Sequence, residues 1–288
     1  MKLDEYIIVQ KQRIFIDICI RGCGSGCAYC YVQSKGQKQE LLSLNQIKSV
    51  CEIIKSKYDC HNRIISLCPN TEPLKTDESI NLVLYIARFF IALGAYIQIS
   101  TKERIPEYFF KEINSIAEGK IYLNISIPYL INTEKIEPNA GSVKDRLQNF
   151  IEIQKYSNLN ICLYIKPFNS SSIDMQYEYI NMIKFYDIKM VCVGVEFDKS
   201  GEMPCQSLYN EDQAKRLFEQ QHSNIDSFIG KIRSCTSAKV YGSSICCIHN
   251  DFFEQCSLRL FKYDEVVCQD CVLWDYKLSK IPLSLRDN

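Results

Sequence analysis

The chain has 288 residues, which suits one large domain or one domain with a small C-terminal module. Lysine and arginine together number 34, as do aspartate and glutamate, so a net charge near zero gives no electrostatic case for tight, nonspecific binding to nucleic acid. Sixteen cysteines are many for this length, and without a signal peptide they predict metal ligation or redox chemistry rather than a disulfide framework.

The hydropathy pattern gives no sign of targeting or membrane insertion. The amino-terminal residues lack the uncharged apolar stretch of a signal peptide. The most apolar segment, Ile80–Gly94, contains Asn81 and Arg88 and is too short to span a bilayer. We therefore expect a soluble, cytoplasmic protein without a membrane partner.

Strand-like and helix-like segments alternate along the chain. Six strands are predicted, at Arg13–Ile20, Arg63–Cys68, Ala95–Thr101, Lys120–Ile127, Asn160–Lys166 and Lys189–Glu196. Helices are predicted near Ser43–Lys57, Asp77–Leu93, Pro106–Ile116, Ser142–Tyr156 and Ile173–Phe185. Ser43 and Ser142 are suited to helix N-termini, Pro106 to a first helical position and Gly94 to a helix end. The alternation predicts a parallel sheet with right-handed crossovers.

Within each predicted strand, one set of alternating residues is apolar and the other is polar or mixed. The fourth strand places Ile121, Leu123 and Ile125 on one face and Tyr122, Asn124 and Ser126 on the other. An open sheet covered by helices on both faces would be apolar on both. We therefore expect an α/β fold with a partial six-stranded barrel, whose apolar face meets the helices and whose polar face lines an open, ligand-holding lumen. This core is placed in residues 1–200, and a cysteine-rich extension in residues 201–288.

A cysteine motif follows the first predicted strand directly. Its residues are Cys23-Gly24-Ser25-Gly26-Cys27-Ala28-Tyr29-Cys30, with the spacing C-x3-C-x2-C. Cysteine thiolates hold iron–sulfur clusters, and three of them on one loop leave one iron of a four-iron cluster without a protein ligand. A zinc knuckle or a disulfide is the alternative, but zinc sites usually add a second pair of ligands, and no fourth ligand lies nearby in the sequence.

This motif, with aromatic Tyr29 before the last cysteine, resembles the signature of the radical S-adenosylmethionine (SAM) superfamily. The resemblance implies that Cys23, Cys27 and Cys30 bind a [4Fe–4S] cluster and that its open iron chelates SAM. An electron from a donor such as flavodoxin or ferredoxin would then cleave SAM to methionine and a 5′-deoxyadenosyl radical, which abstracts hydrogen from a substrate.

A second segment, after the second predicted strand, also resembles the superfamily. Cys68-Pro69-Asn70-Thr71-Glu72-Pro73 is similar to the Gly-Gly-Glu-Pro segment that contacts the SAM amino group. Because the glycines are missing, only Thr71 and Glu72 carry over, and a proline-bounded turn is the alternative.

Later residues resemble the spore photoproduct lyase-like branch. They are Thr101-Lys102, the strand with Asn124 and Ser126, and Glu137-Pro138 followed by Arg146-Leu147. The resemblance implies that Lys102 and Ser126 bind the SAM carboxylate, and that Tyr31, Asn124 and Arg146 line the cofactor site. Solvent-exposed positions for Lys102 and Arg146 are the alternative.

Further cysteines have candidate roles of their own. Cys68 lies near the position of a hydrogen-donor cysteine in that branch, and Cys162 and Cys192 are expected to face the same lumen. Each is otherwise a small packing residue. In the last third of the chain, Cys247, Cys256, Cys268 and Cys271 are the preferred ligands of a second iron–sulfur cluster or a zinc ion. Spare reduced cysteines, with residues 241–246 closing the barrel, are the alternative.

Three functions remain open at this point. A radical enzyme acting on a nucleic-acid base predicts a basic groove beside the cluster, whereas one acting on a peptide or small molecule predicts an uncharged cavity. A zinc- or cluster-binding module without catalysis is the third, and the agreement of Lys102 and Ser126 on the polar face disfavours it. The substrate and the reaction outcome depend on the pocket rather than on the fold.

Overall fold

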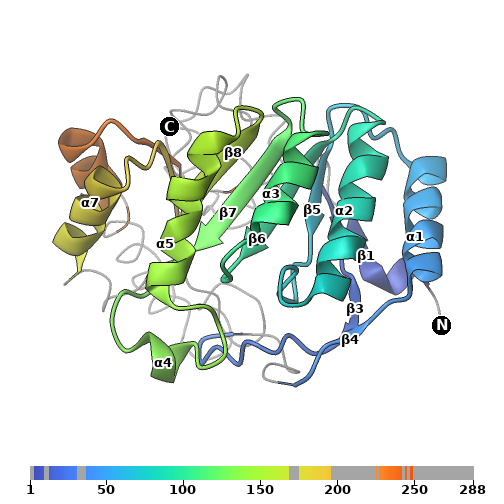
Figure 1. Cartoon of the computed structure of the whole chain (residues 1–288), viewed down its shortest axis with the longest axis horizontal. Coiled ribbons are helices and arrows are strands. Elements are labelled where there is room, and N and C mark those ends of the chain that lie inside the picture. Colours follow the sequence, from blue (N-terminus) through green and yellow to red (C-terminus); the bar gives the residue numbers. More distant parts are fainter. Residues whose placement is uncertain are drawn as a thin grey trace, which may run out of the picture.

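The computed structural model describes residues 3–9, 13–30, 37–168, 175–195 and 227–241, together with residues 225, 244, 247 and 248. In this part of the chain, an eight-stranded sheet has the strand order β1-β2-β5-β6-β7-β8-β9-β10, and β3 and β4 form a separate pair (Figure 1). The strands are β1 (Ile7–Val9), β2 (Arg13–Ile16), β3 (Cys19–Arg21), β4 (Glu40–Leu41), β5 (Ile64–Leu67), β6 (Tyr96–Thr101), β7 (Ile121–Ser126), β8 (Leu159–Phe168), β9 (Met190–Val195) and β10 (Lys239–Tyr241).

The six predicted strands are neighbours in the large sheet, but the first was predicted too long. Arg13–Ile20 ends at Ile16 in β2, and Cys19 and Ile20 belong to β3 in the separate pair. β2, β5, β6, β7, β8 and β9 pair in parallel in this order. The expected α/β architecture with a parallel sheet is therefore confirmed. Two short strands extend it, since β1 pairs antiparallel with β2 and β10 pairs parallel with β9. β10 lies beyond residue 200, where the core was predicted to end. The division of the chain into two parts at that residue stays a prediction.

The helices follow the strands as expected. They are α1 (Leu44–Lys57), α2 (Asp77–Ile91), α3 (Glu107–Asn114), α4 (Thr133–Ile136), α5 (Val143–Glu152) and α7 (Gln176–Phe185), with short 3₁₀ turns η1 (Leu3–Tyr6) and η2 (Ile153–Lys155). Ser43 caps α1, and Ser142 caps α5 by accepting a hydrogen bond from the Asp145 N–H. Pro106 is the N-cap of α3, one residue before the predicted position. No helix in the described residues is long and apolar enough to cross a membrane.

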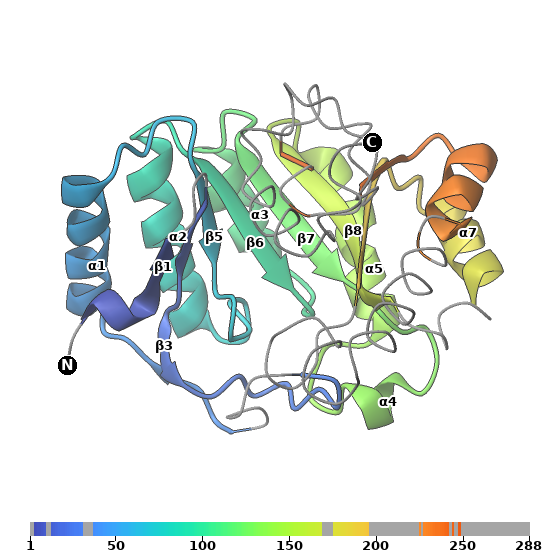
Figure 2. The ribbon, with the colours of Figure 1, turned by 180° about the vertical axis from the view of Figure 1, so that it is seen from behind.

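The apolar residues of the parallel strands form the core with the helices. Ile121, Leu123 and Ile125 of β7 are fully buried in a cluster that includes Phe109 of α3 and Phe150 of α5. Figure 1 shows α1, α2, α3 and α5 side by side over one face of the sheet. Figure 2 shows the opposite face of β5, β6 and β7, over which no described helix lies. For the described helices, the expectation that only one face of the sheet meets helices is met.

The opposite face is polar and is partly covered by the chain itself. The side chain of Gln98 accepts a hydrogen bond from Ser66 at 2.9 Å and donates one to the Ser244 carbonyl at 2.7 Å. The Tyr122 hydroxyl donates to the Ile248 carbonyl at 3.4 Å. This differs from the open lumen that we expected, because residues 244 and 248 supply backbone acceptors to the buried polar side chains.

Candidate cofactor site

The cysteine motif forms a loop that begins directly after β3. Cys23, Cys27 and Cys30 are not in disulfides; Cys27 is buried and the other two are partly exposed. The Cys30 N–H donates to the Cys27 carbonyl at 3.1 Å, which closes a turn between the last two cysteines. The loop enters through Gly22, whose φ of +82° is a left-handed conformation that side chains disfavour. A Cβ at this position would also clash with the backbone of Lys38.

The three cysteine thiols are the donor type that holds an iron–sulfur cluster. Burial raises the pKa of the Cys23 thiol, and it raises that of Cys27 to about 11, although the nearby charge of Lys102 opposes this shift. Metal binding would therefore release protons from this loop. In the part of the chain that the structure describes, no three His, Cys, Asp or Glu side chains are placed to share one metal ion. An iron–sulfur cluster takes each thiolate on a separate iron, and three cysteine thiols are donors of that kind.

Thr71 supports the entrance of the cysteine loop. Its hydroxyl donates to the Gly22 carbonyl at 3.0 Å and accepts from the Gln39 side-chain amide at 2.8 Å. The Cys19 thiol lies 3.3 Å from the same hydroxyl oxygen. These contacts connect the turn after β5 to the residue that precedes Cys23. Direct contact between Thr71 and SAM stays a prediction.

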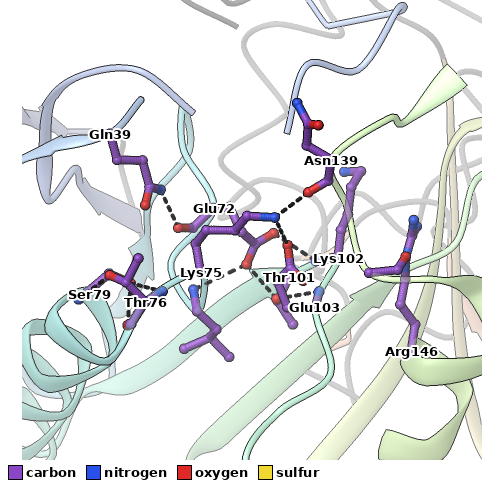
Figure 3. A network of polar contacts seen from close by, with 12 residues as sticks. Gln39, Glu72, Lys75, Thr76, Ser79, Thr101, Lys102, Glu103, Asn139 and Arg146 are labelled. Atoms are coloured by element: carbon purple, nitrogen blue, oxygen red, sulfur yellow. Dashed lines mark hydrogen bonds and ion pairs between the residues drawn. The ribbon is translucent and has the colours of Figure 1, made fainter. Parts of the chain in front are cut away.

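Glu72 joins the carboxyl ends of β5 and β6. Its buried carboxylate accepts hydrogen bonds from the Thr101 hydroxyl at 2.5 Å and the Lys102 N–H at 2.8 Å (Figure 3). Burial raises the pKa of Glu72, and these two hydrogen bonds oppose that shift. Beside it, the Lys75 ammonium lies 2.7 Å from the Glu103 carboxylate and also donates to the Asn139 carbonyl. Glu72 thus fixes the backbone from which the Lys102 side chain extends.

Lys102 lies beside the cysteine loop. Its ammonium is 5.8 Å from the centre of the Tyr29 ring, within the range of a cation–π contact. The same charge lowers the pKa of the Cys27 thiol against the larger effect of burial. The Tyr29 ring also contacts the Tyr129 ring at a tilt, with centroids 5.4 Å apart, and the Tyr29 hydroxyl donates its hydrogen to Glu137. The structure therefore brings together the predicted cluster ligands and the residue predicted to bind the SAM carboxylate.

Arg146 and Glu137 form an ion pair in the interior. The Arg146 Nη1 and Glu137 Oε2 atoms are 2.7 Å apart, and their side chains are 1 % and 0 % exposed. The guanidinium also donates to the carbonyls of Ser126 at 2.9 Å and Gly141 at 2.7 Å. Arg146 is thus buried rather than solvent-exposed, and its guanidinium already binds three acceptors of the chain. A direct contact between Arg146 and SAM stays a prediction.

The segment that contains Glu137 lies against the cysteine loop. The Ala28 N–H donates to the Ile136 carbonyl at 2.8 Å, and the Asn139 N–H donates to the Ser25 carbonyl at 3.3 Å. Together with the Tyr29–Glu137 hydrogen bond, these contacts link the loop to residues 136–139 at three points. No role was predicted for Glu137, although the Glu-Pro pair that contains it was the available signal.

Two buried polar atoms lie on the inner face of the sheet, which is the polar face opposite the helices. The Asn124 amide nitrogen donates to the Ser100 hydroxyl at 3.1 Å. Within the described ranges, however, the Asn124 Oδ1 and Ser126 Oγ atoms are buried and have no hydrogen-bond partner. Buried polar atoms of this kind usually bind another group. Their position fits the expected role of Asn124 and Ser126 in holding a polar ligand.

The other candidate cysteines fall into two groups. Cys68 is buried at the end of β5 with a φ of +57°, and burial raises its pKa well above the usual value. Cys162 and Cys192 are buried on the inner face of β8 and β9, and the Cys162 sulfur lies 3.7 Å from that of Cys247. The hydrogen-donor role of these cysteines stays a prediction. Tyr31, Cys256, Cys268 and Cys271 lie outside the described residues.

Comparison with known proteins supports this description of the fold. No protein-family model matches the chain, and a search of curated proteins finds no match. Among solved structures, spore photoproduct lyase complexed with dinucleoside spore photoproduct is 14 % identical, with a TM-score of 0.56 over 79 % of this chain and 76 % of that chain. Native anSMEcpe with bound AdoMet and Cp18Cys peptide is 15 % identical, with a TM-score of 0.52 over 78 % of this chain and 62 % of that chain.

Both proteins are radical SAM enzymes, and AdoMet is SAM. At identities this low, the likeness establishes that the chain has the fold of radical SAM enzymes. That fold agrees with the partial barrel that the alternating strand pattern predicts. It leaves the chemistry to be argued from the residues at the carboxyl ends of the strands.

Proposed function

We propose that this chain is a radical SAM enzyme, in which Cys23, Cys27 and Cys30 hold a [4Fe–4S] cluster. One observation carries the proposal. The three-thiol loop lies against the carboxyl ends of the parallel strands, where the Lys102 ammonium is 5.8 Å from the ring centre of Tyr29, the residue before Cys30. Ligands of α/β folds bind at this end of the strands. A fold of the same type, found in solved enzymes with bound AdoMet, adds support.

When bound, the cluster would supply the electron that cleaves SAM to methionine and a 5′-deoxyadenosyl radical, which takes a hydrogen atom from the substrate. The chain's own residues would bind and orient SAM. Lys102 places a cation near the SAM carboxylate, and the Asn124 Oδ1 and Ser126 Oγ atoms offer hydrogen-bonding groups on the inner face. Glu72 holds the Lys102 backbone, and Thr71 holds the entrance of the cysteine loop.

The substrate has two candidate classes. Likeness to spore photoproduct lyase, solved with a dinucleoside spore photoproduct, favours a nucleic-acid base and hence repair or modification. Likeness to anSMEcpe, solved with a Cp18Cys peptide, and a net charge near zero favour a peptide or small molecule. In the second case, Cys247, Cys256, Cys268 and Cys271 would hold a further cluster or zinc. We further infer a cytoplasmic enzyme reduced by a flavodoxin- or ferredoxin-type donor.

Anaerobic reconstitution tests the proposal. With iron and sulfide, we expect a brown protein that releases 5′-deoxyadenosine from SAM in the presence of dithionite. Cys27→Ala should lose this activity and most of the iron, because it removes one of three thiolate ligands. Cys235→Ala is the matched control, since Cys235 is exposed and distant in sequence from the motif. Full SAM cleavage by Cys27→Ala would refute the assignment.

A second metal site is tested separately. Iron and zinc are counted in the full chain and in the Cys268→Ala/Cys271→Ala double variant. If the C-terminal cysteines hold a metal, the double variant should lose metal while it keeps the iron of the first site. Equal metal content in both proteins would remove the second site from the proposal.

A further inference from the structure

A cavity of about 360 Å³ lies at the β1–β2 edge of the sheet. Its walls come from three parts of the chain: Tyr6 and Ile8 near the amino terminus, Phe15 and Asp17 along and just after β2, and Asn70 in the turn after β5. None of these residues belongs to the cysteine motif or to the set predicted to bind SAM. The cavity is nevertheless close to that site, because Gly22 also lines it and directly precedes Cys23.

Strand register places this cavity on the polar face of the sheet. Phe15 is the partner of Ser66, and Ser66 is the partner of Gln98, so the three side chains share one face. Ile8 is opposite Phe15 on the antiparallel edge strand and shares that face as well. Asp17 follows Phe15 by two residues, nearer to the carboxyl end. A ligand in the cavity would therefore lie on the face that also carries Asn124 and Ser126.

The cavity combines apolar walls with an excess of negative charge. Ile8 and Ile20 line it and remain 47 % and 39 % exposed, so the cavity offers apolar surface to a ligand. Glu5 and Asp17 contribute two carboxyl groups. Arg21 contributes one guanidinium, but its Nε atom lies 2.6 Å from the Glu40 carboxylate, which neutralises it.

Asp17 is the acid placed deepest in this cavity. It accepts a hydrogen bond from the Cys19 N–H at 3.3 Å and another from the Asn70 side chain. Burial raises the pKa of Asp17 more than these hydrogen bonds lower it, so its carboxylate is incompletely solvated. The same charge, with those of Glu5 and Glu40, adds to the effect of burial in raising the pKa of Tyr6. A cation in the cavity would relieve this local excess of negative charge.

We propose that the cavity binds an organic cation, an amidinium, guanidinium or ammonium group whose charge meets Asp17 and whose apolar part packs on Phe15 and Ile8. Its identification as the substrate's recognition group rests on the proposed function, since the cavity adjoins the cysteine loop. Free amines and basic side chains of a peptide share this chemistry. A phosphate-bearing nucleic acid does not, because its charge has the same sign as that of the cavity.

Binding to the full-length protein tests this without any turnover. The probe is benzamidine, a flat amidinium, and benzamide is its neutral counterpart of similar shape. We expect benzamidine to bind roughly tenfold more tightly by calorimetry, the size of one partly desolvated charge-assisted hydrogen bond. Asp17→Asn should abolish that preference, while Glu78→Gln, which removes an exposed carboxylate from α2, should keep it. Glu5→Gln, at an exposed position, provides a second variant should Asp17→Asn not fold.

The competing sources and outcomes separate clearly. Displacement of benzamidine by acetyl-arginine amide would indicate a peptide, and displacement by spermidine alone would indicate a free amine. Displacement by a thymidine dinucleotide would assign the cavity to nucleic acid and overturn the proposal. Equal binding of benzamidine and benzamide, or an unchanged preference in both Asp17→Asn and Glu5→Gln, would also overturn it. None of these results depends on SAM cleavage, so failure here is distinct from failure of the proposed function.

Discussion

The interior ion pair between Arg146 and Glu137 is the contact whose loss should affect the site most. Arg146→Leu removes the guanidinium and leaves the Glu137 carboxylate fully buried, with the Tyr29 hydroxyl as its remaining side-chain donor among the described residues. It also removes the donors to the carbonyls of Ser126 and Gly141. The change therefore leaves a buried carboxylate without its ion-pair partner and weakens the hold on residues 136–139, which lie against the cysteine loop.

The size of the effect follows from burial. Removing one partner of a buried ion pair costs about 3–5 kcal/mol, a large part of the roughly 5–15 kcal/mol by which a domain is stable. Glu137→Gln should cost less, about 1–3 kcal/mol, because the amide still accepts from Tyr29 and the guanidinium keeps its two carbonyl acceptors. The double variant should cost less than the sum of the two single changes, since both remove the same interaction.

Urea unfolding of the metal-free protein measures these costs, with transitions followed by two probes to establish that they coincide. Arg88→Leu is the matched control, because Arg88 pairs with Glu112 on the surface, where both side chains are about half exposed. That pair should be worth at most about 1 kcal/mol. Iron content after reconstitution reports on the loop. If Arg146→Leu were no more destabilising than Arg88→Leu and bound as much iron, the pair would not be what holds residues 136–139 on the loop.

Two further changes test the loop entrance and the inner face. Gly22→Ala should lower iron loading and destabilise the protein by well over the roughly 1–2 kcal/mol that a left-handed residue costs, because a Cβ there clashes with the Lys38 backbone. Gly24→Ala is the control: it has a similar φ but open space around the Cβ, so it should cost only the left-handed strain. Equal losses of unfolding free energy in urea for the two variants would argue against the clash. Burial lowers the pKa of Lys166 from 10.5 to about 8. Between pH 8 and pH 10.5 the unfolded chain therefore binds a proton that the folded chain lacks. The free energy of unfolding should rise by up to about 3 kcal/mol as the pH increases through this range. Lys166→Met should lose this pH-dependent gain. If the urea midpoints of the original protein and of Lys166→Met changed with pH in the same way from pH 7 to 10, the pKa shift would be contradicted.

Local patterns predicted the regular elements well. β7 is observed at Ile121–Ser126 and α1 at Leu44–Lys57, within a residue of their predicted bounds, because alternation and the Ser43 cap are properties of neighbouring residues. The edge strands Ile7–Val9 and Lys239–Tyr241 were not among the six predicted strands, since three residues are too few to display a period. For the second, closure of the barrel by residues 241–246 was only an alternative. The second of them joins the sheet only through pairing with β9, which lies more than forty positions earlier in the chain.

The partners of charged residues were harder to foresee than the charges themselves. Sequence resemblance assigned Arg146 to the cofactor site, and the structure places it near that site but bound to Glu137 and two carbonyls. Nothing in the spacing of residues 137 and 146 distinguishes an interior pair from two surface charges, because burial is decided by how α5 packs on β7. For the same reason the cavity at Asp17 has no sequence signal, as its walls come together from three separate segments.

The polar face of the sheet gives the strongest link between fold and chemistry. Toward the amino ends of the strands, Gln98 and Tyr122 are satisfied by the carbonyls of Ser244 and Ile248, so the chain itself occupies that half of the face. Toward the carboxyl ends, the Asn124 Oδ1 and Ser126 Oγ atoms stay unpaired within the described residues. Burying such atoms without partners costs about 1–3 kcal/mol each, a cost that a bound polar ligand would remove. The cysteine loop lies at the same end of the strands, which is where a cofactor with a carboxylate and an amino group would contribute most.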